Sequence, residues 1–143
     1  RRRPIDNWPI RCILVYTMTT QTRTAPAGMT FALDGRRHHK LMDAASARRL
    51  PPIYSQDGKP ETEKIAQVKL FCPYSDQRWY ILEMNPGDPQ VFGFTTTRDN
   101  DPEYCYIDLD ELGNAVFFHG IPAIERDLHY TPLTIAAIRA GAY

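Results

Sequence analysis

The sequence predicts an α+β domain: an antiparallel meander sheet of four to five strands with an N-terminal and a C-terminal helix packed on it. From Ile65 onward, apolar and polar residues alternate, which is typical of strands with one buried face. The connections between these strands are short, and a parallel crossover needs about a dozen residues or more. Helical spacing of apolar residues flanks this region on both sides. Strands in a row with flanking helices define the α+β class.

The composition indicates one modest soluble domain. Its 143 residues are too few for two ordinary domains, and 43% hydrophobic with 24% charged residues is close to the globular average. The net charge is zero, but residues 1–49 hold 10 Lys or Arg against 3 acids, and residues 50–143 hold 7 against 14. An acidic body lacks the main attraction to phosphate backbones. Nucleic-acid contact is therefore disfavoured for the acidic body and stays open for the basic N-terminal arm.

Residues 1–35 are expected to be a disordered or extended tail, and residues 36–143 a single α+β domain. The stretch 18–35 is rich in Thr, Ala, Gly and Pro without a sustained period, as linkers are. The early apolar run 12–16 is about a third of the length that a bilayer span needs, so no membrane association is expected. Because Met18 is the first methionine, residues 1–17 are an upstream extension in one interpretation.

The predicted helices and strands follow from the spacing of apolar residues and from the proline and turn-forming residues between them. A helix is expected over 37–49, ended by Pro51-Pro52. Its neighbours His38 and His39 point about 100° apart on a helix, which favours a solvated turn over a shared metal. The expected strands are 65–72, 78–84, 90–96 and 104–109, with 115–119 as an optional fifth.

Turn and cap residues refine this reading. Asn85-Pro86-Gly87-Asp88 predicts a hairpin turn with a positive φ at Gly87. Asp108 is expected to cap a short helix, with Glu111 reaching back and Gly113 closing it. The last helix is expected to start at Thr131 as N-cap, with Pro132 in its first turn.

Three cysteines, Cys12, Cys72 and Cys105, lie far apart without a paired or zinc-like spacing. Neither a disulfide framework nor a structural metal is indicated, and no cofactor is expected. Cys72 and Cys105 fall in strand-like runs and are interpreted as small buried apolar residues. A reducing cytoplasm is the matching compartment.

The charged triplet Glu125-Arg126-Asp127 stands out between apolar residues. Two carboxylates could serve a metal-assisted enzyme, but Arg126 between them would repel a cation. The favoured interpretation is a structural clamp in which flanking acids grip Arg126. Glu83, on the Trp79 face of its strand, would need a partner if buried, and Arg126 is the nearest chemical candidate.

Two aromatic residues, Trp79 and Tyr80, follow Arg78 on one predicted strand, and Phe92 lies on the next. Exposed aromatic side chains beside arginine could stack single-stranded nucleic acid, which gives a second alternative function. Strand alternation instead favours burial of at least part of this set.

Catalytic signatures are missing from the sequence. His119 and His129 have no serine or cysteine in a nucleophile-elbow context, and no Gly-rich phosphate loop, H-E-x-x-H or G-x-S-x-G occurs. These absences count against an enzyme without excluding one, and no catalytic residue is assigned.

Several ordered motifs resemble the bacterial domain-of-unknown-function family 2958 over Leu50 to Leu133. They are Leu50-Pro51-Pro52-Ile53-Tyr54, Val68-Lys69-Leu70-Phe71-x-Pro73, Arg78-Trp79-Tyr80-x-x-Glu83, Phe92-Gly93, Tyr106-Ile107-x-Leu109-x-Glu111-Leu112 and Ile124-Glu125-Arg126-Asp127-Leu128-x-Tyr130-x-Pro132. Cys105 departs from the family pattern, which tends to place Gly there. The resemblance implies a small protein of plasmids, phages or integrated elements, often near antirestriction genes, and it implies no activity.

The expected function is a non-enzymatic interaction module of a mobile element that binds an unknown host or element protein. A sharper variant is an antirestriction factor whose carboxylates replace DNA phosphates. The alternatives are the metal-assisted enzyme through Glu125 and Asp127, and single-strand binding through Trp79, Tyr80 and Phe92.

Overall fold

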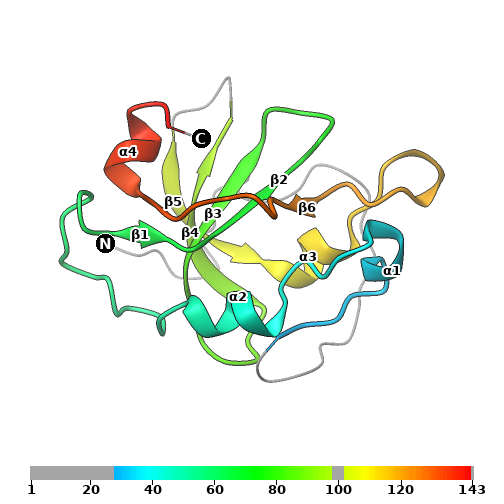
Figure 1. The fold of residues 1–143 in the computed structure, drawn as a ribbon, viewed down its shortest axis with the longest axis horizontal. Helices are drawn as coiled ribbons and strands as arrows, with labels where there is room; N and C mark the ends of the chain where they lie inside the picture. Colours follow the sequence, from blue (N-terminus) through cyan, green and yellow to red (C-terminus); the bar gives the residue numbers. More distant parts are fainter. Residues whose placement is uncertain (1–27, 98–101, 143) are drawn as a thin grey trace.

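The computed structural model describes residues 28–97 and 102–142 (Figure 1). The expectations for residues 1–17, the basic arm and Cys12 lie outside these ranges. The main sheet is antiparallel and has five strands in the order β5-β4-β3-β2-β6, which confirms the predicted α+β class. Its strands are β2 (Val68–Phe71), β3 (Arg78–Met84), β4 (Gln90–Thr96), β5 (Glu103–Asp108) and β6 (Glu125–Arg126).

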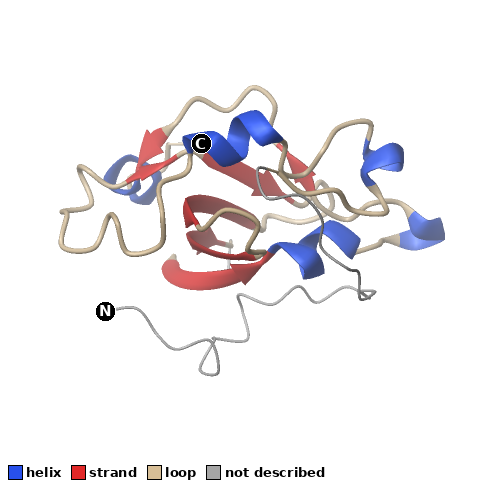
Figure 2. Cartoon of the chain, turned by 90° about the horizontal axis from the view of Figure 1, so that it is seen from below, coloured by secondary structure: helices blue, strands red, loops and turns tan. Residues whose placement is uncertain are grey.

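Short helices lie at the periphery of the sheet (Figures 1 and 2). They are α1 (Asp34–Arg37), α2 (Ala44–Arg49), α3 (Leu109–Asn114), α4 (Ile135–Arg139) and the 3₁₀ turn η3 (Phe118–Gly120). Figure 1 shows α4 at the opposite end of the sheet from α1. Both chain-end regions of the described residues therefore contribute helices to the fold, as the sequence predicts.

The first predicted strand divides between two sheets. Its start forms β1 (Ile65–Ala66), which pairs with β7 (Leu133–Thr134), and the remainder is β2 in the main sheet. At the junction, the Gln67 amide donates to the Ile81 carbonyl at 3.0 Å. The predicted burial is confirmed for Ala66, Val68, Leu70 and Cys72. The prediction that all four share one face is wrong, because Ala66 packs in a different core cluster from the other three.

The prediction of one helix over 37–49 is wrong. The chain leaves α1 at His38, which has a left-handed φ of 63°, and re-enters a helix only after Asp43. The intervening Leu41 and Met42 are fully buried, and the Met29 amide donates to the Met42 carbonyl at 2.9 Å. An irregular segment can place both neighbouring side chains in the core, whereas helix neighbours diverge by about 100°.

The optional strand at 115–119 and the N-cap at Thr131 are also wrong. Val116 makes only an isolated bridge with Pro122, and η3 follows it, so β6 is the fifth strand. The last helix begins after Thr134, whose side chain accepts from the Ala137 amide at 3.2 Å. Pairing of β7 with β1 holds the preceding residues extended, and this delays the helix.

The predicted turn at Gly87 and the side-chain cap at Asp108 are confirmed, but within the described residues the Glu111 side chain does not bond back to Asp108. Gly87 has a φ of 73°, and the Asp88 amide donates to the Asn85 carbonyl at 3.1 Å. Asp108 caps α3 by accepting from the Asp110 amide at 2.8 Å. Gly113, however, lies inside α3 rather than at its end.

A bulge in β3 determines which residues face each core. The β3–β4 register shifts between Ile81 and Glu83, so Leu82 is an extra residue. Trp79, Ile81 and Met84 therefore share the larger cluster, although simple alternation would put Met84 opposite Trp79. Tyr80 and Leu82 join a smaller cluster on the other face, with Ala66, Phe94, Ile135 and Ile138. Burial on both faces makes β3 the centre of the molecule.

The larger core reaches upstream of residue 36. Met29 and Phe31 are 1% and 4% exposed and belong to the same cluster as Trp79. The Phe31 ring lies so close to Gly113 that an added Cβ there would come within 2.4 Å of it. The region expected to be a tail therefore contributes core side chains from residue 29 onward.

Candidate functional site

The predicted acidic grip on Arg126 does not form. Arg126 instead donates from Nη2 to Asp43 Oδ2 at 2.9 Å and from Nε to the Lys40 carbonyl at 3.0 Å. Asp127 pairs with Lys69 at 3.2 Å. Because Glu125 and Arg126 are neighbours in β6, their side chains point to opposite faces. Arg126 thus joins the sheet edge to the cap of α2.

Asp43 serves both the helix cap and this ion pair. Its Oδ1 accepts from the Ser46 amide at 2.7 Å. Burial alone raises the pKa of Asp43, but the hydrogen bonds from Ser46 and the charges of Arg126 and Arg49 outweigh it, so the pKa lies below its ordinary value. The carboxylate is therefore held ionised where α2 meets β6.

The proposed surface aromatics are interior residues. Trp79 and Tyr80 are both fully buried, and Phe92 is 6% exposed. The alternative in which these rings lie at the surface is wrong, and the burial that strand alternation favoured is confirmed. Bases cannot stack on these rings in this fold.

Metal-ligand geometry is not found for the acids of the triplet. Among residues 28–97 and 102–142, no group of three or more His, Cys, Asp or Glu side chains is placed to hold a metal ion.

Over the same residues, no helix has the length and hydropathy that a membrane crossing requires.

Glu83 is fully buried, and it holds a loop rather than Arg126. Its two carboxylate oxygens accept from the backbone amides of Tyr54 at 3.1 Å and Gln56 at 2.6 Å. Glu83 follows the bulge residue Leu82, so the bulge directs this carboxylate toward the loop. Hydrogen bonds from two amides are the compensation that a buried carboxylate needs.

The Gln56 side chain completes this attachment. Its Nε2 donates to the carbonyl of the bulge residue Leu82 at 3.1 Å. The same amide group accepts from the Ile65 amide at 2.8 Å and donates to the Ile65 carbonyl at 3.3 Å. The side-chain amide of Gln56 thus bonds backbone groups of both β1 and β3, as a residue of an intervening strand would. We call residues 53–56 the docked loop.

Tyr54 is strained within the docked loop. Its φ is 74°, in the left-handed region that non-glycine residues rarely adopt. Its side chain is 60% exposed, with the hydroxyl 3.4 Å from the Tyr106 hydroxyl. Such strain persists only where surrounding contacts enforce it, and it is concentrated at functional sites.

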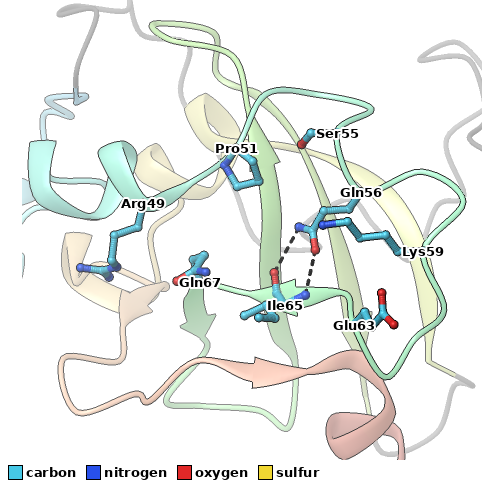
Figure 3. Close-up of a pocket in the computed structure, with 8 residues that line it drawn as sticks. All are labelled: Arg49, Pro51, Ser55, Gln56, Lys59, Glu63, Ile65 and Gln67. Carbon is cyan, nitrogen blue, oxygen red and sulfur yellow. Dashed lines mark hydrogen bonds between the residues drawn. The ribbon is translucent and has the colours of Figure 1, made fainter.

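A cleft of about 270 Å³ lies beside the docked loop (Figure 3). Figure 3 shows Arg49 on one side and Lys59 on the other, with Gln56 and Ile65 between them. Its lining comes from the end of α2, the docked loop, the following turn and the β1–β2 junction: Arg49, Pro51, Ser55, Gln56, Lys59, Glu63, Ile65 and Gln67.

A second surface feature is a set of stacked rings, the aromatic corner (Tyr74, Phe117 and Phe118). Tyr74 and Phe117 stack with centroids 4.3 Å apart and planes 8° apart, and Phe118 meets Phe117 edge-on at 4.6 Å. Phe118 is 71% exposed, the largest value among the exposed apolar side chains described. Its loop, in orange, projects beyond the sheet in Figure 1.

The loop that carries Phe118 is held by a side chain from another part of the chain. Arg36 Nη1 donates to the Gly120 carbonyl at 2.9 Å and to the His119 carbonyl at 3.3 Å. His119 and Gly120 both have positive φ, at 58° and 71°. The positive φ at Gly120 favours glycine there. The exposed ring is therefore presented by an ordered turn.

A cluster of polar and charged groups fixes α4 to the rest of the fold. Glu61 accepts from Arg139 through both oxygens, at 2.8 and 3.0 Å, and from the Tyr104 hydroxyl at 2.9 Å. The Arg139 hydrogen bond, opposed by burial, lowers the pKa of Glu61. Burial and the hydrogen bond to Glu61 raise the pKa of Tyr104.

Sequence reasoning missed the docked loop and the aromatic corner. The motif Leu50-Pro51-Pro52-Ile53-Tyr54 was visible, but nothing local connects it to a carboxylate 29 residues later. Phe117-Phe118 directly before His119-Gly120 was the available signal for the corner, because two adjacent rings in a turn cannot both be buried easily.

These features describe a small α+β protein with a bulged central strand, a strained docked loop and a presented aromatic turn. Comparison with protein families matches residues 36–140 to DUF2958, described as a protein of unknown function. The chain belongs to this family. Comparisons with curated proteins and with solved structures found no match.

Proposed function

We propose that the chain is a non-enzymatic interaction module that binds another protein through the aromatic corner. The observation that carries this proposal is the Phe118 ring, 71% exposed on a turn that Arg36 holds in place. Rings held rigidly at a surface lose little entropy on binding and are frequent binding hot spots.

The proposed setting is the cytoplasm of a bacterium that carries a plasmid, phage or integrated element, and the partner is a host or element protein. Antirestriction or maintenance of the element is the proposed biological role. Mimicry of DNA by carboxylates receives less support, because the described fold exposes several cations: Arg36, Lys40, Arg48 and Arg49.

Affinity capture with matched variants tests the proposal. The wild-type chain, immobilised and exposed to host lysate, is expected to retain a specific protein, which is then purified and titrated directly. Phe118→Ser should weaken this binding roughly 30-fold or more, as loss of a hot spot of about 2 kcal/mol does. Leu128→Ser is the control, because Leu128 is also exposed, at 56%, but lies outside the aromatic corner.

The two variants separate the possible outcomes. Equal binding by wild type, Phe118→Ser and Leu128→Ser would show that the partner uses another surface. Equal weakening by both serine variants would show that capture reflects general hydrophobicity. Either result contradicts binding through the aromatic corner.

A further inference from the structure

We propose that the cleft beside the docked loop binds a small organic anion that carries a carboxylate or phosphate group. The cleft, at about 270 Å³, lies just below the usual range of small-molecule sites and suits a compact metabolite. This site is separate from the aromatic corner and does not rest on the proposed protein-binding function.

The charges of the lining favour an anion. Arg49 and Lys59 lie at opposite ends of the lining, and the Lys59 amine points toward Gln56 (Figure 3). Within the described part of the chain, the side chains of Lys59 and Gln67 make no hydrogen bond, and Arg49 has only a charge interaction with Asp43. Their donors are therefore available to a ligand, and charge-assisted hydrogen bonds are the strong ones.

The wall between these cations is already rigid. Gln56 is 6% exposed and makes three side-chain hydrogen bonds, and Glu83 fixes the backbone beside it. A ligand that enters the cleft would not have to order the docked loop, so little binding energy is lost. The strained Tyr54 is consistent with a loop held in one shape for recognition.

Glu63 limits the class of ligand. This carboxylate lies near Lys59 in Figure 3 and belongs to the same lining. It repels a bare anion and can accept a hydrogen bond. A ligand with both an anionic group and a hydrogen-bond donor therefore fits the lining better than a simple anion. For a simple anion, removing the Glu63 charge should increase affinity.

Amide NMR titration of the full chain tests the site. Inorganic phosphate and citrate are added separately at constant ionic strength, so that phosphate and carboxylate recognition are distinguished. The signals of Gln56, Lys59 and Gln67 should shift and saturate with at least one anion. Arg49→Gln and Lys59→Gln should each weaken binding about tenfold, the effect of losing a charge-assisted hydrogen bond of about 1.5 kcal/mol.

Two further variants make the test specific. Arg48→Gln should leave the affinity unchanged, since Arg48 neighbours Arg49 and is exposed but does not line the cleft. Glu63→Gln should tighten binding. The proposal is overturned if neither anion gives saturable shifts, or if Arg48→Gln weakens binding as much as Arg49→Gln. Phe118→Ser should leave anion binding intact, which separates this proposal from the protein-binding one.

Discussion

At the scale of single residues, Arg37 is a buried cation that needs several hydrogen-bond partners. It is buried, donates from Nε to the Ile124 carbonyl at 2.7 Å and from Nη2 to the Gly113 carbonyl at 3.0 Å, and pairs with Asp34. Burial lowers its pKa, and the charge of Asp34 offsets part of that effect. One guanidinium thus joins α1, α3 and the segment before β6.

Replacing Arg37 should destabilise the protein strongly. Arg37→Met leaves the Asp34 carboxylate, which is 10% exposed, without its cation and two carbonyls without donors, so the free energy of unfolding should fall by about 3–5 kcal/mol. Urea denaturation followed by circular dichroism measures this. Arg48→Met on the exposed face of α2 is the control, with a change within about 0.5 kcal/mol. Similar midpoints for both variants would contradict the structural role of Arg37.

Two glutamates should affect stability in opposite directions as the pH changes. The folded pKa of Glu61 lies below its ordinary value of 4.5, so its contribution is present above that pH and is lost as the pH falls through the folded pKa. Glu61→Gln should therefore be destabilising at neutral pH, by about 1 kcal/mol or less for so exposed a pair, and its effect should shrink in acid.

Glu111 should affect stability in the opposite direction from Glu61. Burial, and next the charge of Asp108, raise the pKa of Glu111, so the folded state favours the protonated form and the ionised form is unfavourable at neutral pH. Glu111→Gln should stabilise the protein at pH 7, with the gain fading as the pH falls toward the raised pKa. Thermal unfolding across pH measures both variants, and parallel curves for them would contradict this assignment.

At the scale of elements, the bulge in β3 connects the sheet to the docked loop. Leu82 is the extra residue, the Glu83 carboxylate accepts from the Gln56 amide, and the Gln56 side chain donates to the Leu82 carbonyl. Bulges recur beside functional sites because they redirect side chains. The cleft in Figure 3 lies beside the Gln56 amide, which bridges Ile65 of β1 and Leu82 of β3.

This bridge can be tested by substitution of Gln56. Gln56→Leu keeps the approximate volume but leaves the Ile65 and Leu82 backbone groups without their partner, which should cost about 1–3 kcal/mol. The amides of Ile65 and Tyr54 should also exchange with solvent faster. Ser55→Ala, on the same loop, should leave Ile65 exchange unchanged. Slow exchange in Gln56→Leu would show that another group holds β1.

Elements with strong local signals were predictable, and those set by distant contacts were not. The turn at Gly87 and the cap at Asp108 depend on residues a few positions apart. The break of the first helix at His38 depends instead on burying Leu41 and Met42 together. The partner of Arg126, Asp43, lies 83 residues away, and nothing in the local sequence specifies it.

At the scale of the whole molecule, the folded unit includes residues that precede the family match at 36. Met29 and Phe31 fill the larger cluster, and the Phe31 ring lies against Gly113 in α3. The glycine in α3 and the ring upstream are complementary, since a side chain at position 113 would occupy the space of the ring. The core of this protein is therefore closed by a segment outside the match.

Substitution of these two side chains should show that dependence. Phe31→Ala should lower the free energy of unfolding by about 3–5 kcal/mol and Met29→Ala by about 2–5 kcal/mol, because each leaves a cavity in a packed core. Together they would remove much of a typical total of about 5–15 kcal/mol. Thr30→Ala, between them and exposed, is the control. The measurement is the urea midpoint of each variant, compared with that of the wild-type full chain. If both core variants unfold at the wild-type midpoint, the segment before residue 36 merely rests on the domain, and the match from residue 36 contains the whole cooperative unit.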